Sequence, residues 1–456
     1  MTSRFLRLGC VGLVAAVALS VPQPDLRADT ATSVSAATES LIPREDVLNL
    51  EPGPIPYVEG ENPERWPSIL SQAAVVMDMD TGAVVYAKAP DALHYPASIT
   101  KIMTALLALR LGHLNDVLTA SADAVRQPPD KLYMRVGEKA TLKDLLYGLL
   151  VDSANDAAVE IAERYGGSVS HFAEMMNQAA RDLGATHTHF VNPSGLPDPH
   201  HVTTAYDMAL IARAAMQIPE FRAMVDTRSF EWKGTAWQAN LTNLNRMLFT
   251  YPGAIGVKTG FTSVAHETLV VAATRGGTTF LAVLMDCPTD AEIRDDATNL
   301  LNYAFAHYAT QRILPEGHRA GVLTGKEGED PVVTAEPVLA TVPLGHPLDV
   351  VERVSLRAPD EPLAKGTRVG EMTLVDAATN ERLGSVPLVV ARPYEPEPKP
   401  IAWPRLVAPA GAALALLAAA ALHFQRRRRS RLARRARVVR VQPWQESWQN
   451  ARRNRR

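Results

Sequence analysis

A serine and a lysine separated by two residues, in Ser98-Ile-Thr-Lys101, most strongly limit what this chain can fold into. On a helix these two side chains lie on one face, so the amine of Lys101 can reach the hydroxyl of Ser98. A serine hydroxyl is a poor nucleophile at its ordinary pKa and needs a neighbouring base. Lysine can be that base where burial or a nearby cation lowers its pKa. Alone, the pair fits a helix N-cap followed by a solvated lysine equally well. Other parts of the sequence are needed to distinguish this interpretation from a nucleophile and its base.

Two further short motifs follow in chain order, Ser153-Ala-Asn155 and Lys258-Thr-Gly260. Ser153 can relay a proton to a leaving amine, and the amide of Asn155 offers both a donor and an acceptor. Lys258 and Thr259, at the edge of a predicted strand, suit a carboxylate at the end of a peptide. Gly260 removes a side chain where a substrate would lie along that strand. Each motif alone is common in proteins, whereas the three motifs in this order are a highly specific signal of one type of active site.

The order of predicted elements favours an α/β (α+β) domain in which helices flank a mostly antiparallel sheet. Two β-rich runs around Thr81-Gly82 predict a hairpin over 73–87. Apolar periodicity predicts helices that begin at Ser98 and that lie within 142–165, 170–183 and 204–216. The domain is completed by predicted strands over 254–260, 268–273 and 279–285, and by a helix over 294–309.

The composition changes after Leu314, where short β-rich segments alternate with Pro, Gly and Asp. These segments are 338–342, 350–356, 370–375 and 386–390. They predict a small all-β domain after the α/β domain. We therefore assign 63–312 to the α/β domain, 313–393 to the β-rich domain and 394–404 to a stiff proline-rich stalk.

The beginning of the chain has the pattern of a secretory signal peptide, residues 1–28. Arg4 and Arg7 precede an uncharged, mostly apolar run from Leu8 to Val21. Residues 29–62 are rich in Ser, Thr, Ala, Pro and Glu without periodicity, which predicts a disordered spacer. Removal of the signal would leave Cys287 as the single cysteine, so no intramolecular disulfide is expected. We expect Cys287 to be a small buried residue rather than a reactive one.

The end of the chain predicts a transmembrane helix over 405–425 and a cytoplasmic tail over 426–456. The uncharged run 406–424 would be about 28 Å long as a helix, close to the thickness of the hydrocarbon core of a bilayer. The tail holds 13 arginines and one acidic residue, and the positive-inside rule places it in the cytoplasm. The preceding domains would then lie on the extracytoplasmic side of the cell membrane. A basic run next to a membrane span favours anionic lipid headgroups over nucleic acid.

The ordered motifs resemble those of the D-alanyl-D-alanine carboxypeptidase family, the low-molecular-mass penicillin-binding proteins. The resemblance extends over about 65–395 and includes the stretches 133–137, 188–196 and 204–209. It implies a serine β-lactamase/DD-peptidase-like domain and fits a β-rich domain downstream. It also implies peptidoglycan stem peptides ending in D-Ala-D-Ala as substrates and β-lactams as covalent inhibitors. No metal or cofactor is implied.

The family resemblance implies a role for each matched residue. Ser98 would attack the carbonyl between the two terminal D-alanines, and Lys101, its pKa depressed by Lys258, would accept the proton. The backbone N–H groups of Ser98 and Phe261 would form the oxyanion hole. Phe261 stands where the family often has histidine, which changes the character of the pocket while leaving its backbone donor. A further arginine often assists the carboxylate, and Arg246 and Arg294 are both candidates.

Three other functions compete with a membrane-anchored carboxypeptidase. A class A β-lactamase needs a glutamate for deacylation, and the stretch 187–194, where it is expected, contains no acid. An endopeptidase that cuts peptide cross-links would use the same residues. A non-catalytic scaffold that binds the wall would have no need for Ser98, Lys101, Ser153 and Lys258 together.

Overall fold

The computed structural model describes residues 66–397, apart from 346–348, 358, 378–379 and 381. The predicted signal peptide, spacer, transmembrane helix and basic tail lie outside these residues, as does most of the predicted stalk. None of the helices within the described ranges is long and apolar enough to cross a membrane. The described residues form two compact units: the larger extends to 321 and includes 333–357 and 368–389, and the smaller includes 322–332, 358–367 and the residues from 390.

The larger unit contains a five-stranded antiparallel sheet in the order β2-β1-β9-β8-β7. Its strands are β1 (Ala73–Asp78), β2 (Val84–Lys88), β7 (Ala254–Thr262), β8 (His266–Arg275) and β9 (Thr278–Cys287). The predicted hairpin and the three predicted strands are therefore confirmed. Because β7 is at the edge, its outer backbone groups face away from the sheet. Strand β7 carries the motif Lys258-Thr-Gly260.

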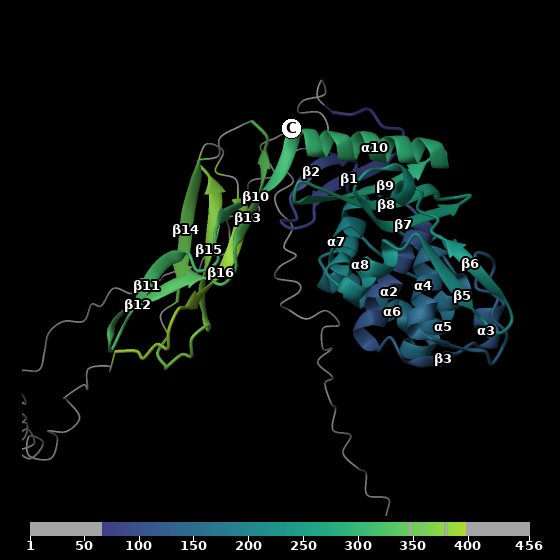
Figure 1. The fold of residues 1–456 in the computed structure, drawn as a ribbon, viewed down its shortest axis with the longest axis horizontal. Coiled ribbons are helices and arrows are strands. Elements are labelled where there is room, and N and C mark those ends of the chain that lie inside the picture. Colours follow the sequence, from purple (N-terminus) through teal and green to yellow (C-terminus); the bar gives the residue numbers. More distant parts are fainter. Residues whose placement is uncertain (1–65, 346–348, 358, 378–379, 381, 398–456) are drawn as a thin grey trace, which may run out of the picture. The chain divides into compact units, whose positions relative to one another are not determined.

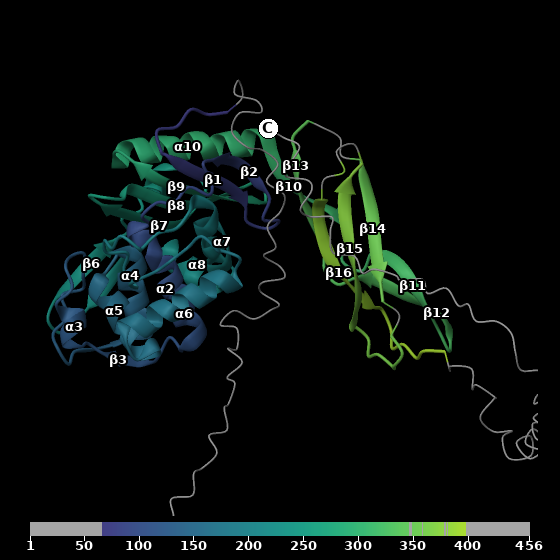
Figure 2. The same cartoon turned by 180° about the vertical axis from the view of Figure 1, so that it is seen from behind.

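Helices cover both faces of this sheet, and the two views in Figures 1 and 2 agree on the layers. Helix α10 (Asp290–His307) covers one face. The opposite layer contains η1 (Ala97–Thr100), α2 (Lys101–Leu111), α3 (Ala122–Val125), α4 (Leu142–Val151), α5 (Asn155–Gly166), α6 (Val169–Asp182), α7 (Ala205–Met216) and α8 (Pro219–Val225). A short helix, α9 (Met247–Thr250), precedes β7.

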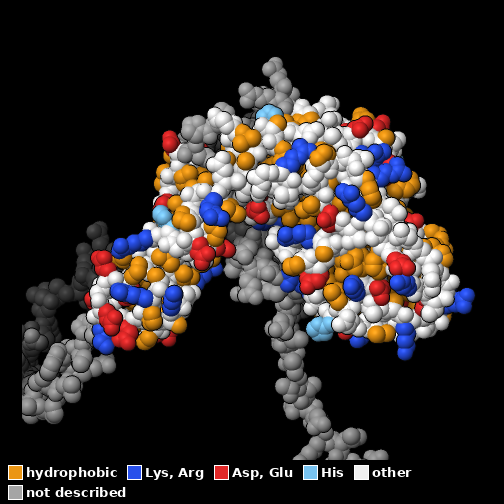
Figure 3. Space-filling view, in the orientation of Figure 1, with side chains coloured by type: hydrophobic (Ala, Val, Ile, Leu, Met, Phe, Trp, Pro, Cys, Tyr) orange, Lys and Arg blue, Asp and Glu red, His pale blue; other side chains and the backbone are white. Residues whose placement is uncertain are grey.

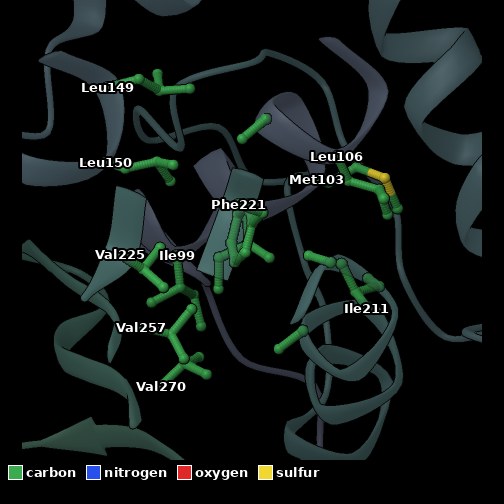
Figure 4. Packing of buried hydrophobic residues seen from close by; sticks show 14 of the residues in the cluster. Ile99, Met103, Leu106, Leu149, Leu150, Ile211, Phe221, Val225, Val257 and Val270 are labelled. Atoms are coloured by element: carbon green, nitrogen blue, oxygen red, sulfur yellow. The ribbon is translucent and has the colours of Figure 1, made fainter. Parts of the chain in front are cut away.

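Strand β8 explains why both faces are covered, because it is apolar on both sides. Leu269 and Val271 belong to the apolar cluster under α10, whereas Val270 and Ala272 belong to the cluster under the other helices. Side chains alternate between the faces of a strand, so a continuous apolar run requires two layers. Figure 4 shows Ile99 next to Val257 and Val270 in the second cluster. The residue after Ser98 thus anchors the nucleophile segment in the core.

The predicted helical region 142–165 is two helices rather than one. Helix α4 ends at Val151 and α5 begins at Asn155, with Ser153 at φ +63° between them. Neither Gly nor Pro marks the break at 152–154, so the sequence did not predict it. The predicted closing helix 294–309 begins at Asp290, with Thr289 as its N-cap, and ends at His307. Tyr308 already belongs to the next strand.

Two small two-stranded sheets were not predicted. Strand β3 (Val117–Thr119) pairs with β4 (Lys139–Thr141), and β5 (Ser229–Lys233) pairs with β6 (Gln238–Thr242). In β5 and β6 only Trp232 and Leu241 are buried, one residue in each strand. Both strands nevertheless alternate polar and apolar residues, with Phe230 and Trp232 in β5 and Ala239 and Leu241 in β6, so the sequence did contain a period-two pattern here.

The region after α10 is β-rich, as predicted. Strand β10 (Tyr308–Leu314) pairs with β13 (Val338–Pro343). A second five-stranded sheet has the order β11 (Arg319–Gly325), β12 (Gly328–Thr334), β16 (Arg382–Val390), β15 (Arg368–Asp376) and β14 (Val350–Leu356). The domain boundary near 312 stays a prediction. On the face in Figure 3, acidic, basic and apolar side chains are interspersed.

Candidate active site

The segment that carries Ser98 is held against the edge strand of the main sheet. Ser98 lies in the 3-10 turn η1, which continues directly into α2. A Cβ atom added to Gly260 would lie 2.7 Å from the backbone nitrogen of Ser98. The hydroxyl of Thr268 donates to the carbonyl of Pro96 at 2.9 Å and to that of Gly260 at 3.1 Å. Glycine at 260 is therefore required for this close approach of two backbones.

The amine of Lys101 contacts the hydroxyl of Ser98. Lys101 Nζ donates to Ser98 Oγ at 2.8 Å and to the carbonyl oxygen of Ser194 at 2.6 Å. The Lys101 side chain has no exposed surface. Burial, followed by the ammonium of Lys258, holds the pKa of Lys101 well below its ordinary value, while Asp130 acts in the opposite direction. The neutral amine that a general base requires is favoured by this environment.

Lys258 is the second buried lysine of the site. Its Nζ donates to the carbonyl oxygen of Thr259 at 2.8 Å, and the residue is 1% exposed. Burial lowers the pKa of Lys258 to about 8, against the attraction of Asp130 and Asp152. Two lysines with lowered pKa values therefore lie together, where they repel one another.

A buried loop supplies the second acceptor for Lys101. Asn192 Oδ1 accepts hydrogen bonds from the backbone nitrogens of Ser194 at 3.1 Å, Gly195 at 2.8 Å and Leu196 at 3.2 Å. Its Nδ2 donates to the carbonyl of Leu196 at 2.9 Å. Thr104 on α2 donates to the carbonyl of Pro193 at 2.6 Å. These bonds fix the direction of the Ser194 carbonyl that meets Lys101.

The second predicted motif lies at the break between α4 and α5. Ser153 is 3% exposed and lines the same cavity as Ser98. Asn155 is the first residue of α5, and its Nδ2 donates to the carbonyl of Pro128 at 3.0 Å. Its backbone nitrogen donates to Asp130 O at 2.7 Å. The Asn155 amide thus supports the 128–130 segment, which the sequence prediction did not include in its role.

An open cavity of about 880 Å³ connects these groups. Its lining includes the predicted residues Ser98, Ser153, Thr259, Gly260 and Phe261. Lys101, Asn155 and Lys258 are buried and do not belong to the lining. The remaining lining residues are Pro129, Asp130, Thr242, Asn243, Leu244, Arg246, Phe249, Thr250, Glu267 and Asp290.

Both candidate arginines meet at Asp290. Arg246 Nη1 lies 3.2 Å from Asp290 Oδ2, and Arg294 Nη2 lies 3.1 Å from the same oxygen. Arg246 lines the cavity and its side chain is 66% exposed, whereas Arg294 is outside the lining. The structure therefore brings Arg246 to the cavity directly and connects Arg294 to it through Asp290.

Several groups of this site were not identified from the sequence. The carboxylates of Asp130 and Asp152 set the charge around Lys258, and the Ser194 carbonyl contacts Lys101. Asp152 directly precedes Ser153, so its position could have marked it. Ser194 lies 93 positions from Lys101, and no local pattern connects them. The cavity wall over 242–250 likewise matches no motif.

The environments of Cys287 and His201 indicate structural roles for both residues. Cys287 is buried, as predicted, and burial raises the pKa of its thiol to about 11, so it remains protonated. His201 Nε2 lies 2.8 Å from Thr100 Oγ1, and its Nδ1 accepts from the Val191 backbone at 3.0 Å. Burial lowers the pKa of His201 to about 4. A neutral His201 thus joins the start of α2 to the loop that contacts Lys101.

A serine whose hydroxyl contacts a buried lysine defines a class of acyl-transferring hydrolase, and comparisons with known proteins place the chain within that class. Residues 60–289 match the D-alanyl-D-alanine carboxypeptidase family. D-alanyl-D-alanine carboxypeptidase DacF of Bacillus subtilis is 32% identical over 316 residues, which cover 67% of this chain and 81% of that protein. The D-alanyl-D-alanine carboxypeptidase of Streptomyces sp. strain K15 is 35% identical over 258 residues, covering 53% of this chain and 89% of that protein.

A solved structure agrees with these sequence matches. Penicillin binding protein 5 from Haemophilus influenzae superposes with a TM-score of 0.63 at 29% identity, covering 72% of this chain and 99% of that one. The chain belongs to the D-alanyl-D-alanine carboxypeptidase family of serine peptidases. Family membership supports the carboxypeptidase over the β-lactamase, endopeptidase and scaffold alternatives.

Proposed function

We propose that this serine-type D-alanyl-D-alanine carboxypeptidase removes the terminal D-alanine from peptidoglycan stem pentapeptides through an acyl-enzyme on Ser98. The observation that carries the proposal is the 2.8 Å contact between Lys101 Nζ and Ser98 Oγ, made by a lysine without exposed surface. A lowered pKa leaves Lys101 able to accept a proton, which an ordinary lysine at neutral pH cannot do.

In the acylation step, Ser98 Oγ bonds to the carbonyl carbon of the penultimate D-alanine while Lys101 Nζ accepts the hydroxyl proton. The negative charge that develops on the carbonyl oxygen would be stabilised by the backbone N–H groups of Ser98 and Phe261. Each such donor is typically worth about 3–4 kcal/mol in the transition state. The C–N bond then breaks, and the amine of the leaving D-alanine takes from Lys101 the proton that came from Ser98, with Ser153 as the relay.

The terminal carboxylate of the substrate distinguishes an exopeptidase from other peptidases. Lys258 and Thr259 lie on the edge strand, and Thr259 lines the cavity. A charged Lys258 attracts a carboxylate, and the same charge lowers the pKa of Lys101. Binding and base activation would therefore depend on one cation. In deacylation, water attacks the ester carbon and Lys101 accepts its proton. Lys101 then passes this proton to Ser98 Oγ as the ester C–O bond breaks.

We further propose that the enzyme acts on the extracytoplasmic side of the cell membrane. The support is in the sequence: residues 1–28 resemble a signal peptide, and residues 405–425 are apolar and precede an arginine-rich tail. The proline-rich residues 394–404 would hold the active site above the membrane. Shortening this stalk should impair activity on intact wall while activity on soluble peptide is kept, and unchanged wall activity would contradict it.

The test of the proposed activity uses the full chain in detergent with a fluorescent penicillin, followed by intact mass and peptide mapping. We expect a stable mass gain on Ser98, no gain in Ser98→Ala, and release of D-alanine from a pentapeptide in a parallel assay. Rapid turnover of the penicillin would indicate a β-lactamase instead. The absence of both labelling and D-alanine release would refute the assignment.

A further inference from the structure

One wall of the active-site cavity, residues 243–249, has buried polar side chains and exposed apolar side chains. We call it the inverted wall. Asn243 and Asn245 are 4% and 1% exposed, whereas Leu244 between them is 41% exposed and Phe249 is 49% exposed. Leu244 and Phe249 both line the cavity that contains Ser98. A chain segment ordinarily buries its leucine and exposes its asparagine, so this inversion requires a reason.

Hydrogen bonds of the buried asparagines hold the wall in this form. Asn243 Nδ2 donates to Thr227 O at 2.9 Å, and Asn243 Oδ1 accepts from the backbone of Asn245 at 2.9 Å. The backbone nitrogen of Leu244 donates to Val151 O at 3.2 Å, and Val151 lies two residues before Ser153. Burying amide groups costs free energy unless they are paired. The burial of these two amide groups, despite its free-energy cost, fits a backbone whose conformation presents Leu244 to the cavity.

The inverted wall adjoins β7, the strand that carries Lys258 and Thr259. Helix α9 ends at Thr250, and only three residues separate it from the start of β7 at Ala254, against which it packs. That end of β7 leads into Lys258 and Thr259. Under the proposed function, the carboxylate of the terminal residue binds there, so the side chain of that residue would meet the inverted wall.

We propose that Leu244 and Phe249 form an apolar subsite for the side chain of the leaving residue, so that the enzyme releases D-amino acids with extended side chains as well as D-alanine. The inference rests on the proposed function. The bond broken and the water consumed are the same, and only the leaving group differs. A methylene stem would contact Leu244 and Phe249.

Charged groups surround the apolar subsite. Arg246 and Asp290 line the same cavity, and their ion pair is partly exposed, with side chains 66% and 43% accessible. A long side chain with a polar end would therefore place its stem on apolar atoms and its end among charges. A D-alanine methyl group is too short to use either.

The experiment compares two N-acylated tripeptides, one ending in D-Ala-D-Ala and one in D-Ala-D-norleucine, with the full chain in detergent. We expect the wild type to cleave both, with kcat/KM values within about tenfold of each other. Each methylene group that leaves water contributes about fourfold. The ratio of kcat/KM for the norleucine peptide to that for the alanine peptide should therefore fall about fivefold in Leu244→Ser and in Phe249→Ser.

Val117→Ser is the matched control, since Val117 is 57% exposed and lies on β3, outside the cavity lining. It should leave the ratio unchanged. Leu244→Trp, which fills the subsite, should selectively exclude norleucine. Rejection of the norleucine peptide by wild type, or an unchanged ratio in both serine variants, would overturn the inference while D-alanine release continues. Loss of D-alanine release in wild type would instead refute the proposed function.

Discussion

Lys101 Nζ lies 2.8 Å from Ser98 Oγ and shares its protons with only one further acceptor among the described residues, the Ser194 carbonyl at 2.6 Å. The amine is thus held between the nucleophile and a backbone oxygen. Local helical geometry explains the first contact, and a loop folded from a distant part of the chain supplies the second. The position of the base therefore depends on a residue that lies 93 positions away in the sequence.

Asn192 should act as a positioning residue for Lys101. In Asn192→Ala, the loop loses the acceptor that binds three backbone nitrogens, so the Ser194 carbonyl is no longer fixed. We expect kcat for D-alanine release to fall about tenfold to a hundredfold, the range of about 1 Å of misplacement, with KM little changed. Steady-state kinetics with a soluble pentapeptide measure this split.

Asn177→Ala is the control for that loss. Asn177 accepts from the Phe190 backbone at 2.7 Å and donates to Phe190 O at 2.8 Å, on the same loop but away from Lys101. It should reduce stability by about 1–3 kcal/mol without lowering kcat. Asn192→Asp keeps the acceptor and should recover part of the activity. An equal loss of kcat in Asn177→Ala would show that general loop stability, not the position of Lys101, is responsible.

The pH dependence of kcat/KM should have an alkaline limb near the Lys258 pKa of about 8. Lys258 is a cation below this pH and loses its charge above it, so attraction for the substrate carboxylate declines as pH rises. Asp152 raises the pKa of Lys258, and therefore Asp152→Asn should move the limb to lower pH. Profiles between about pH 6 and 10 measure the shift, with exposed Asp123→Asn as control. Movement toward higher pH would contradict the electrostatic assignment.

The part of the site that lies within single elements could be predicted from the sequence. Ser98 and Lys101 share a helix turn, and Lys258-Thr-Gly260 lies on one strand, so residue spacing determined both. The helix break at Ser153 was not predicted, because a φ of +63° at a serine has no signal in the pattern of apolar residues. The contact of Lys101 with Ser194 depends on tertiary packing between positions 93 apart. The inverted wall at Leu244 contradicts burial rules and is recognised only from its exposure.

Gly260→Ala should abolish most activity through a steric effect alone. Its Cβ would lie 2.7 Å from Ser98 N and 2.6 Å from Thr268 Oγ1, distances that require one backbone to move. Displacing Ser98 by a fraction of an ångström to 1 Å should lower the rate of penicillin acylation by about a hundredfold. Gly321→Ala is the control, because its Cβ would approach only the flexible Leu356 side chain at 3.1 Å. Normal acylation of Gly260→Ala would exclude the proposed fit between η1 and β7.

Glu160 should make the folded protein less stable as pH rises. It is 2% exposed on α5, and among the described residues neither of its carboxylate oxygens has a hydrogen-bond partner. Burial, followed by the charges of Asp156, Glu163 and Glu138, raises the pKa of Glu160 from 4.5 to about 8. Between these two values the folded state keeps a proton that the unfolded state has lost. The contribution of Glu160 to the free energy of unfolding is therefore fully present below about pH 4.5 and declines up to about pH 8. Above that pH it no longer changes.

Glu160→Gln removes this titration while keeping the shape of the side chain. The variant should match the wild type near pH 4.5 and become progressively more stable than it toward pH 8, with a limiting difference in slope of about 1.4 kcal/mol per pH unit. Urea unfolding at several pH values measures the difference. Glu174→Gln, whose side chain is 75% exposed, should parallel the wild type throughout. If Glu160→Gln also parallels the wild type, Glu160 ionises normally in the folded state, and its burial must be relieved by water or by movement of α5.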